Sequence, residues 1–119
     1  MAQHLHAKSW IGVDLDGTLA HYDHWRGADH IGKPVKLMVR RVQAMIAKGY
    51  TVKIFTARAH NANHEEIKFI EDWTEEHLGH RLEITCIKDP GMIQLYDDRA
   101  VQVMPNTGKI VYLKKDKVR

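Results

Sequence analysis

Asp14 and Asp16 are the residues whose types and spacing point most directly to chemistry. They follow the apolar run 10–13 and stand immediately before Gly17. Side chains at positions i and i+2 of a strand lean to the same face, so both carboxylates can reach one reacting group. Glycine tolerates the sharp turn that must follow. The pattern indicates a site at the carboxyl edge of an α/β sheet.

Two simpler interpretations of this motif exist. Asp-x-Asp-Gly is common in turns, because Asp and Gly both suit turn geometry. A calcium loop of the EF-hand type needs Gly at its sixth position and Glu at its twelfth. Counted from Asp14, those positions hold Leu19 and Trp25, which excludes the calcium loop. On the motif alone, a purely structural turn remains an alternative.

Other polar residues stand at the ends of later apolar runs. Thr56 ends the run 51–56, and the pair Asp97 and Asp98 follows the run 93–96. Each is unremarkable alone, since Thr favours strands and paired Asp residues occur in turns. Right-handed crossovers in a parallel sheet would bring the ends of these strands together. We therefore expect convergence of Asp14, Asp16, Thr56, Asp97 and Asp98.

Four carboxylates in one crevice require a cation or a proton, because they otherwise repel one another. Hard oxygen ligands with open positions suit Mg²⁺, which keeps several waters and also binds phosphate oxygens. The cluster therefore suits a bound Mg²⁺ ion.

The motifs and their order resemble the haloacid dehalogenase (HAD) superfamily of phosphohydrolases. Residues 13–19 look like its first motif, Ile54-Phe55-Thr56 like the second, Lys88 like the third and residues 95–98 like the fourth. The resemblance covers most of the chain, from about Trp10 to about Ala100. It implies a phosphate monoester hydrolase that works through an aspartyl-phosphate.

The resemblance also implies a role for each matching residue. Asp14 would be the nucleophile, and Asp16 the general acid and then the general base. Thr56 would bind phosphate oxygens and Lys88 would neutralise charge. The magnesium ligands would be the Asp14 carboxylate, the Asp16 main-chain carbonyl and the Asp97-Asp98 pair. Of that pair, Asp97 is the preferred direct ligand, with Asp98 binding directly or through water.

Arg58 and Arg99 are further candidates for substrate binding. Thr56-Ala57-Arg58 and Asp97-Asp98-Arg99 resemble the versions of these motifs in polynucleotide 3'-phosphatases of the superfamily. Arginine offers a planar fork for phosphate, although a solvated or acid-paired arginine is the alternative. The expected substrate is a nucleotide or polynucleotide 3'-phosphate, or a small phosphorylated metabolite.

Two other functions fit the same motifs. A binding module could keep the fold and recognise phosphorylated ends without turnover, although the Asp14 and Asp16 pair argues against it. A phosphotransferase would pass the phosphoryl group to an acceptor other than water. Superfamily members that cleave carbon–halogen bonds lack the second acid, so Asp16 favours phosphoryl chemistry.

Composition indicates one ordinary globular domain, residues 1–119, with a net charge of +3. No apolar run approaches the ~20 residues of a membrane span, and residues 1–8, which we expect to be flexible, hold no apolar signal core. Cys86 is the single cysteine, which fits a cytoplasmic protein, and its apolar surroundings predict a buried thiol.

Residues 17–33 form a long polar stretch that predicts a functional loop. In the resembled family this stretch forms a flap beside the site, and the chain leaves no room for a cap domain there or in the connection 57–81. The site is then open to a bulky substrate, or is covered by a partner subunit in a homo-oligomer. Tyr22, Trp25 and His30 could contact substrate; alternatively, the two aromatic rings pin the loop to the core.

The remaining pattern predicts a Rossmann-like, HAD-like three-layer α/β sandwich without a cap. We expect strands over 9–14, 51–56, 82–87 and 93–96 in a mostly parallel sheet with helices on both faces. One helix begins at Pro34 and ends at Gly49; another is capped by Asn61 or Asn63 and ends at Gly79. A C-terminal β-hairpin flanks residues 105–108. The connection from Lys88 to Asp97 is short for a crossover, so either its helix is reduced to 89–92 or the local topology differs. We therefore expect Lys88 to approach from the end of the third strand.

Overall fold

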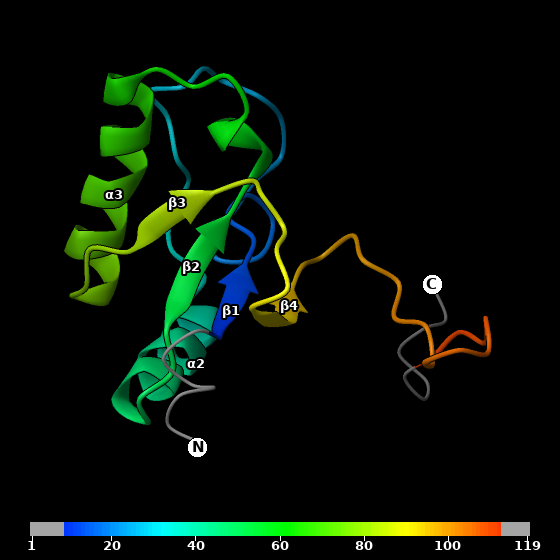
Figure 1. Cartoon of the computed structure of the whole chain (residues 1–119). Helices are drawn as coiled ribbons and strands as arrows, with labels where there is room; N and C mark the ends of the chain where they lie inside the picture. The colour runs from blue at the N-terminus through cyan, green and yellow to red at the C-terminus, as the bar shows by residue number, and fades with distance from the viewer. Residues whose placement is uncertain (1–8, 113–119) are drawn as a thin grey trace.

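A four-stranded, all-parallel sheet organises the computed structural model, which describes residues 9–112 (Figure 1). Its strands are β1 (Trp10–Val13), β2 (Val52–Phe55), β3 (Glu83–Thr85) and β4 (Met92–Tyr96). Their spatial order is β3-β2-β1-β4, with every neighbouring pair parallel. The predicted α/β class and parallel sheet are confirmed. The first three predicted strands were slightly too long, as is usual at element ends.

Two helices connect the first three strands, and their ends follow local sequence signals. Helix α2 (Lys36–Ala47) begins just after Pro34, and helix α3 (His64–Leu78) follows a capping box at Asn63. There the Asn63 side chain accepts a hydrogen bond from Glu66 N at 2.8 Å, and the Glu66 carboxylate accepts one from Asn63 N at 3.0 Å. These bonds satisfy amide groups that the first helical turn leaves free. Of the two predicted caps, Asn63 is therefore the one used.

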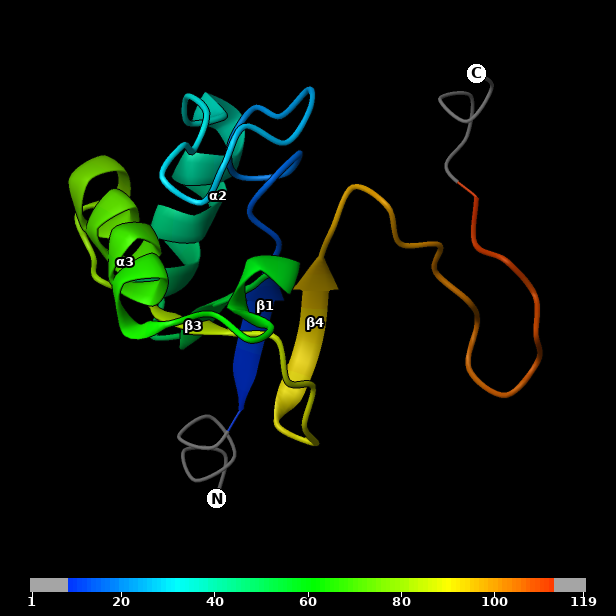
Figure 2. The same cartoon turned by 90° about the horizontal axis from the view of Figure 1, so that it is seen from above.

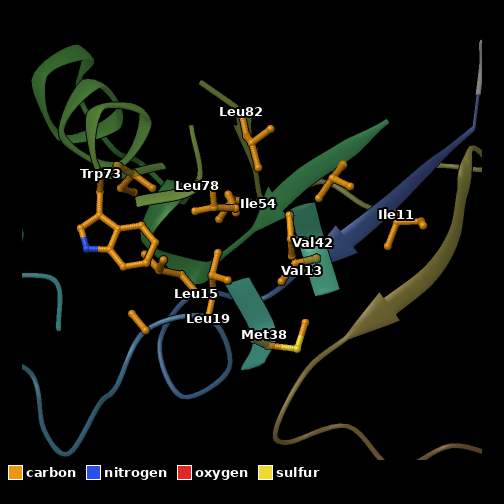
Figure 3. Packing of buried hydrophobic residues seen from close by; sticks show 13 residues of the cluster. Ile11, Val13, Leu15, Leu19, Met38, Val42, Ile54, Trp73, Leu78 and Leu82 are labelled. Atoms are coloured by element: carbon orange, nitrogen blue, oxygen red, sulfur yellow. The ribbon is translucent and has the colours of Figure 1, made fainter. Parts of the chain in front are cut away.

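Both helices pack on the same face of the sheet, where they contact each other and one shared core (Figure 3). Alternate residues of the central strands point into this core, as the two-residue period of a strand requires. The core consists of Ile11, Val13, Leu15, Leu19, Ala20, Met38, Val42, Val52, Ile54, Ile70, Trp73, Leu78 and Leu82.

The prediction of helices on both faces, and hence of three layers, is wrong for the described residues. Strand order supplies the reason: β1, β2 and β3 are successive neighbours, so both crossovers move in one direction along the sheet. Right-handed crossovers in one direction place their helices on one face. The return from β3 to β4 would supply the opposite layer, but residues 86–91 hold no helix. We expected that the crossover helix before β4 could be reduced to residues 89–92, and the structure confirms that this connection holds no helix.

The helix-free face is covered locally by side chains and by the return segment, which crosses in front of the sheet in Figure 1. Trp10 is buried there, with its ring 6.3 Å from that of Phe55 and with the Lys53 ammonium 4.6 Å from its centre. The Trp10 indole N–H donates to Asp89 Oδ1 at 2.9 Å. This bond fixes the path by which the chain returns to β4.

The C-terminal hairpin is present as a turn with a single bridge between Val103 and Ile110, without regular strands. It stands apart from the sheet in both views (Figures 1 and 2). The predicted flexible residues 1–8 and the end of the predicted hairpin at Leu113 lie outside the described residues. No helix within residues 9–112 combines the length and apolar character needed to cross a bilayer.

Candidate functional site

The carboxyl ends of β1, β2 and β4 meet at one edge of the sheet, where a cavity of about 830 Å³ opens. Six of the predicted site residues line this cavity, and they come from three separate parts of the chain. They are Asp14, Asp16, Thr56, Arg58, Asp97 and Arg99. The predicted convergence is correct because the central strands are neighbours and run in the same direction.

Asp14, Asp97 and Asp98 form a compact group of acids within this edge. One carboxylate oxygen from each lies within 4.8 Å of the others, close enough to bind one metal ion. The backbone brings them together, because Asp14 N donates to Tyr96 O at 2.9 Å and so continues the pairing of β1 with β4. All donors are hard oxygens, which suits Mg²⁺ better than softer metals. Asp16 is not a member of this group.

Thr18 joins the two acid-bearing loops. Its hydroxyl donates to Asp98 Oδ1 at 3.1 Å and accepts from Asp98 N at 3.0 Å. The turn before it requires a glycine, because Gly17 has a φ of +94° and an added Cβ would lie 2.6 Å from Asp98 Oδ2. The close approach of the two loops therefore depends on Gly17 as well as on Thr18.

The electrostatics of Asp14 reflect this crowding. Burial of its carboxyl group, its hydrogen bond with Asp98 and the negative charges of Asp97 and Asp98 together raise its pKa to about 7. Desolvation and like charges both disfavour the anion. A divalent cation at this position would remove that penalty, since it supplies the opposite charge.

Asp16 is held by Arg58 and not by the other acids. Arg58 Nε donates to Asp16 Oδ2 at 2.8 Å and Arg58 Nη2 donates to Asp16 Oδ1 at 2.9 Å. The pair is well shielded, with 9% of the Arg58 side chain and 18% of the Asp16 side chain exposed. Arg58 Nη1 is buried and has no hydrogen-bond partner among the described residues. The predicted substrate-binding arginine thus has an acid partner and still holds an unused donor.

Thr56 and Arg99 occupy the predicted edge in different ways. Thr56 is buried at the end of β2, and its hydroxyl accepts a hydrogen bond from Arg58 N at 3.1 Å. Arg99 is exposed, and its backbone N–H donates to Asp97 Oδ1 at 2.7 Å. Both residues line the cavity, and their contact with a substrate stays a prediction.

Lys88 does not line the cavity and is exposed beyond the end of β3. It lies in the helix-free segment that returns from β3 to β4. Its predicted electrostatic role therefore stays a prediction. The buried thiol predicted for Cys86 is wrong, because Cys86 is partly exposed and lines the cavity.

Residues 17–33 form the predicted loop without helix or strand, and two aromatic residues in it face the cavity. Tyr22 is 44% exposed and Trp25 is 55% exposed, so neither ring pins the loop to the core. Trp25 stacks on Arg58 instead, with 4.8 Å from the guanidinium carbon to the ring centre. Sequence reasoning missed this stack and the role of Thr18, since neither contact has a local signature.

Comparison with protein-family models, curated proteins and solved structures found no match to this chain.

Proposed function

We propose that this chain is a magnesium-dependent phosphate monoester hydrolase of the HAD type. The observation that carries the proposal is the meeting of Asp14, Asp97 and Asp98 within 4.8 Å of one another, beside a cavity that Arg58 and Arg99 also line. An acid cluster beside cationic side chains suits a ligand that is both anionic and metal-binding. Phosphate esters have that combination, because their oxygens bind Mg²⁺ and arginine alike.

The metal would be held by the carboxylates of Asp14, Asp97 and Asp98, together with the Asp16 main-chain carbonyl. When bound, Mg²⁺ supplies charge neutralisation that allows an anionic nucleophile to approach an anionic phosphate. The pKa of about 7 for Asp14 fits this requirement, since the carboxylate needs a cation to be stable as an anion at neutral pH.

The reaction then divides among the residues of this chain. Asp14 attacks phosphorus in line and forms an aspartyl-phosphate as the ester oxygen leaves. Asp16, protonated at a lone pair that Arg58 leaves free, donates this proton to that oxygen. It later regains a proton from the water that breaks the bond between phosphorus and Asp14 and releases inorganic phosphate. Thr56 and Arg58 line the cavity in which the phosphate would bind, and Arg58 Nη1 has no other hydrogen-bond partner among the described residues. Lys88 would move towards the phosphate from its exposed position.

The cavity favours a substrate larger than inorganic phosphate. Its volume of about 830 Å³ lies within the range of ~300–1,000 Å³ typical of small-molecule sites. Trp25 and Tyr22 offer aromatic surface beside it, which suits a nucleotide or the 3'-phosphorylated end of a polynucleotide. A small phosphorylated metabolite would also fit this volume.

Phosphate release from an ester panel, with Mg²⁺ or with chelator, tests the proposal. The panel includes para-nitrophenyl phosphate, nucleoside monophosphates and 3'-phosphorylated oligonucleotides. We expect turnover that requires Mg²⁺ and is lost in Asp14→Asn, which removes the nucleophile at nearly constant size. The matched control is Asp72→Asn on α3, which removes an acid outside the site.

Each outcome of this panel has a clear meaning. No turnover of any ester in Mg²⁺ would contradict the hydrolase and favour a module that binds phosphorylated ends. Turnover retained by Asp14→Asn would contradict the nucleophile assignment. Transfer of phosphate to an added alcohol or nucleoside, in place of release to water, would identify a phosphotransferase.

A further inference from the structure

The loop formed by residues 20–33, called the flap below, is closed tightly at its base. Ala20 forms a bridge with Pro34, and His21 N donates to Lys33 O at 2.8 Å. Gly32 allows this approach, because a Cβ at that position would lie 2.0 Å from His21 O. The two ends of the flap are therefore held together by backbone contacts.

The tip of the flap contacts the rest of the protein at Arg58. The Trp25 ring covers the Arg58 guanidinium at 4.8 Å, and the His30 carbonyl accepts a hydrogen bond from Arg58 Nη2 at 2.9 Å. Residues 21–26 are exposed, so few other contacts oppose movement of the tip. A cation under an indole ring is attracted to it and is shielded from water by it.

The same arginine determines how Asp16 is oriented. Both Asp16 oxygens accept hydrogen bonds from Arg58, so the plane of the carboxyl group follows the plane of the guanidinium. Two parallel bonds from a rigid fork restrict direction more strongly than a single bond does. The chain of contacts runs from the flap through Arg58 to Asp16.

We propose that Trp25 and the His30 carbonyl are positioning groups that orient Asp16 through Arg58, so that closure of the flap sets the general acid. This inference rests on the proposed hydrolase function. Neither group needs to touch the reacting atoms: Trp25 shields and orients the guanidinium, and His30 holds its second amino group. When the flap opens, Arg58 loses both restraints and Asp16 loses its fixed direction.

Two esters with different leaving groups separate this role from direct substrate contact. Departure of the ribose 5-phosphate hydroxyl needs a proton from Asp16, whereas para-nitrophenolate leaves without one. The ratio kcat/KM depends only on the steps up to formation of the aspartyl-phosphate. It therefore reports the proton transfer to the leaving group and is not affected by the later hydrolysis of the aspartyl-phosphate. A positioning residue should therefore matter more for ribose 5-phosphate than for para-nitrophenyl phosphate.

We expect Trp25→Ala to lower kcat/KM for ribose 5-phosphate about tenfold more than for para-nitrophenyl phosphate, a fraction of the ~10²–10⁴ that general acid catalysis contributes. Trp25→Phe, which keeps an aromatic face over Arg58, should restore part of the ratio. His24→Ala, the matched control, removes an exposed flap side chain outside the cavity lining and should leave the ratio unchanged.

The opposite pattern would overturn the inference. If Trp25 contacts substrate directly, Trp25→Ala should affect the aromatic ester at least as much as the sugar phosphate. A wild-type protein that turns over no ester of the panel in Mg²⁺, ribose 5-phosphate included, would refute the hydrolase itself. A wild-type protein that turns over both, with an unchanged ratio in Trp25→Ala, would refute the positioning role alone.

Hydrogen exchange provides a second measurement that does not depend on turnover. Arg58→Ala removes both contacts of the flap tip, so we expect faster exchange at the amides of residues 22–31 and unchanged exchange in α2. Unchanged exchange in the flap would mean that Arg58 does not hold it, and the inference would be wrong.

Discussion

Thr18 and Asp98 are joined by two hydrogen bonds, although 80 positions separate them in the chain. The Thr18 hydroxyl donates to the Asp98 side chain at 3.1 Å and accepts from its backbone N–H at 3.0 Å. The loop after β1 is thereby tied to the loop after β4. Because each loop supplies acids to the proposed metal site, this pair controls the spacing of those acids.

Thr18→Val should weaken this connection without changing the size of the side chain. We expect a loss of about 1 kcal/mol in the free energy of unfolding, since an amide loses its partner at a partly exposed site. We also expect a smaller rise in melting temperature on addition of Mg²⁺, because the acids are less well placed. Thermal unfolding with and without Mg²⁺ measures both. Thr51→Val, at an exposed position before β2, is the control, and equal effects in the two variants would contradict the prediction.

The raised pKa of Asp14 predicts an unusual dependence of stability on pH when metal is absent. The native state keeps the Asp14 proton up to about pH 7, whereas the ordinary pKa is 3.8. The native state therefore binds more protons in this window, and its stability falls as the pH rises through it. Urea unfolding in chelator at about pH 5 and about pH 8 should show this loss, and Mg²⁺ should reverse it. Asp14→Asn should lack this contribution, and an equal pH dependence in that variant would exclude Asp14 as the cause.

Alanine substitutions at two glycines distinguish the effect of backbone strain from the effect of displacing residues of the site. Gly17 and Gly49 have similar left-handed φ values, +94° and +97°, but an added Cβ meets Asp98 at Gly17 and open space at Gly49. Both alanine variants should be destabilised by about 1 kcal/mol or more through backbone strain. Only Gly17→Ala should also lose Mg²⁺-dependent stabilisation and phosphate release. Normal metal binding in Gly17→Ala would mean that the two loops separate without cost to the site.

Lys88 allows a test of charge neutralisation apart from metal binding. It is exposed and outside the cavity lining, so we expect Lys88→Ala to leave stabilisation by Mg²⁺ unchanged. If it moves to the phosphate during the reaction, its removal should lower kcat by about 10²-fold, the lower end of effects seen for electrostatic stabilisers. Lys109→Ala, in the C-terminal turn, controls for loss of a surface charge. A normal kcat in Lys88→Ala would remove this residue from the mechanism.

Much of the local structure could be predicted because its causes are local. The helical spacing from Val35 to Ile46 and the Asn63 capping box locate α2 and α3, since both signals depend on residues within a few turns. The alternation of strands and helices predicts a parallel sheet for the same reason. The prediction of helices on both faces was wrong because it depended on the order of the strands in the sheet. Packing of both helices on one face follows from the order β3-β2-β1-β4, and the hydrophobic periodicity of the sequence does not reveal that order.

The sequence by itself determined which residues stand at the ends of the strands, because an apolar run and a following turn are properties of neighbouring residues. It thereby selected Asp14, Asp16, Thr56 and Asp97 as candidates. Only the tertiary structure decided their partners: Asp14 lies with Asp97 and Asp98, whereas Asp16 pairs with Arg58. The physical reason is that ion pairs and hydrogen bonds act over a few ångströms in space. Which groups come within that range depends on how distant segments pack.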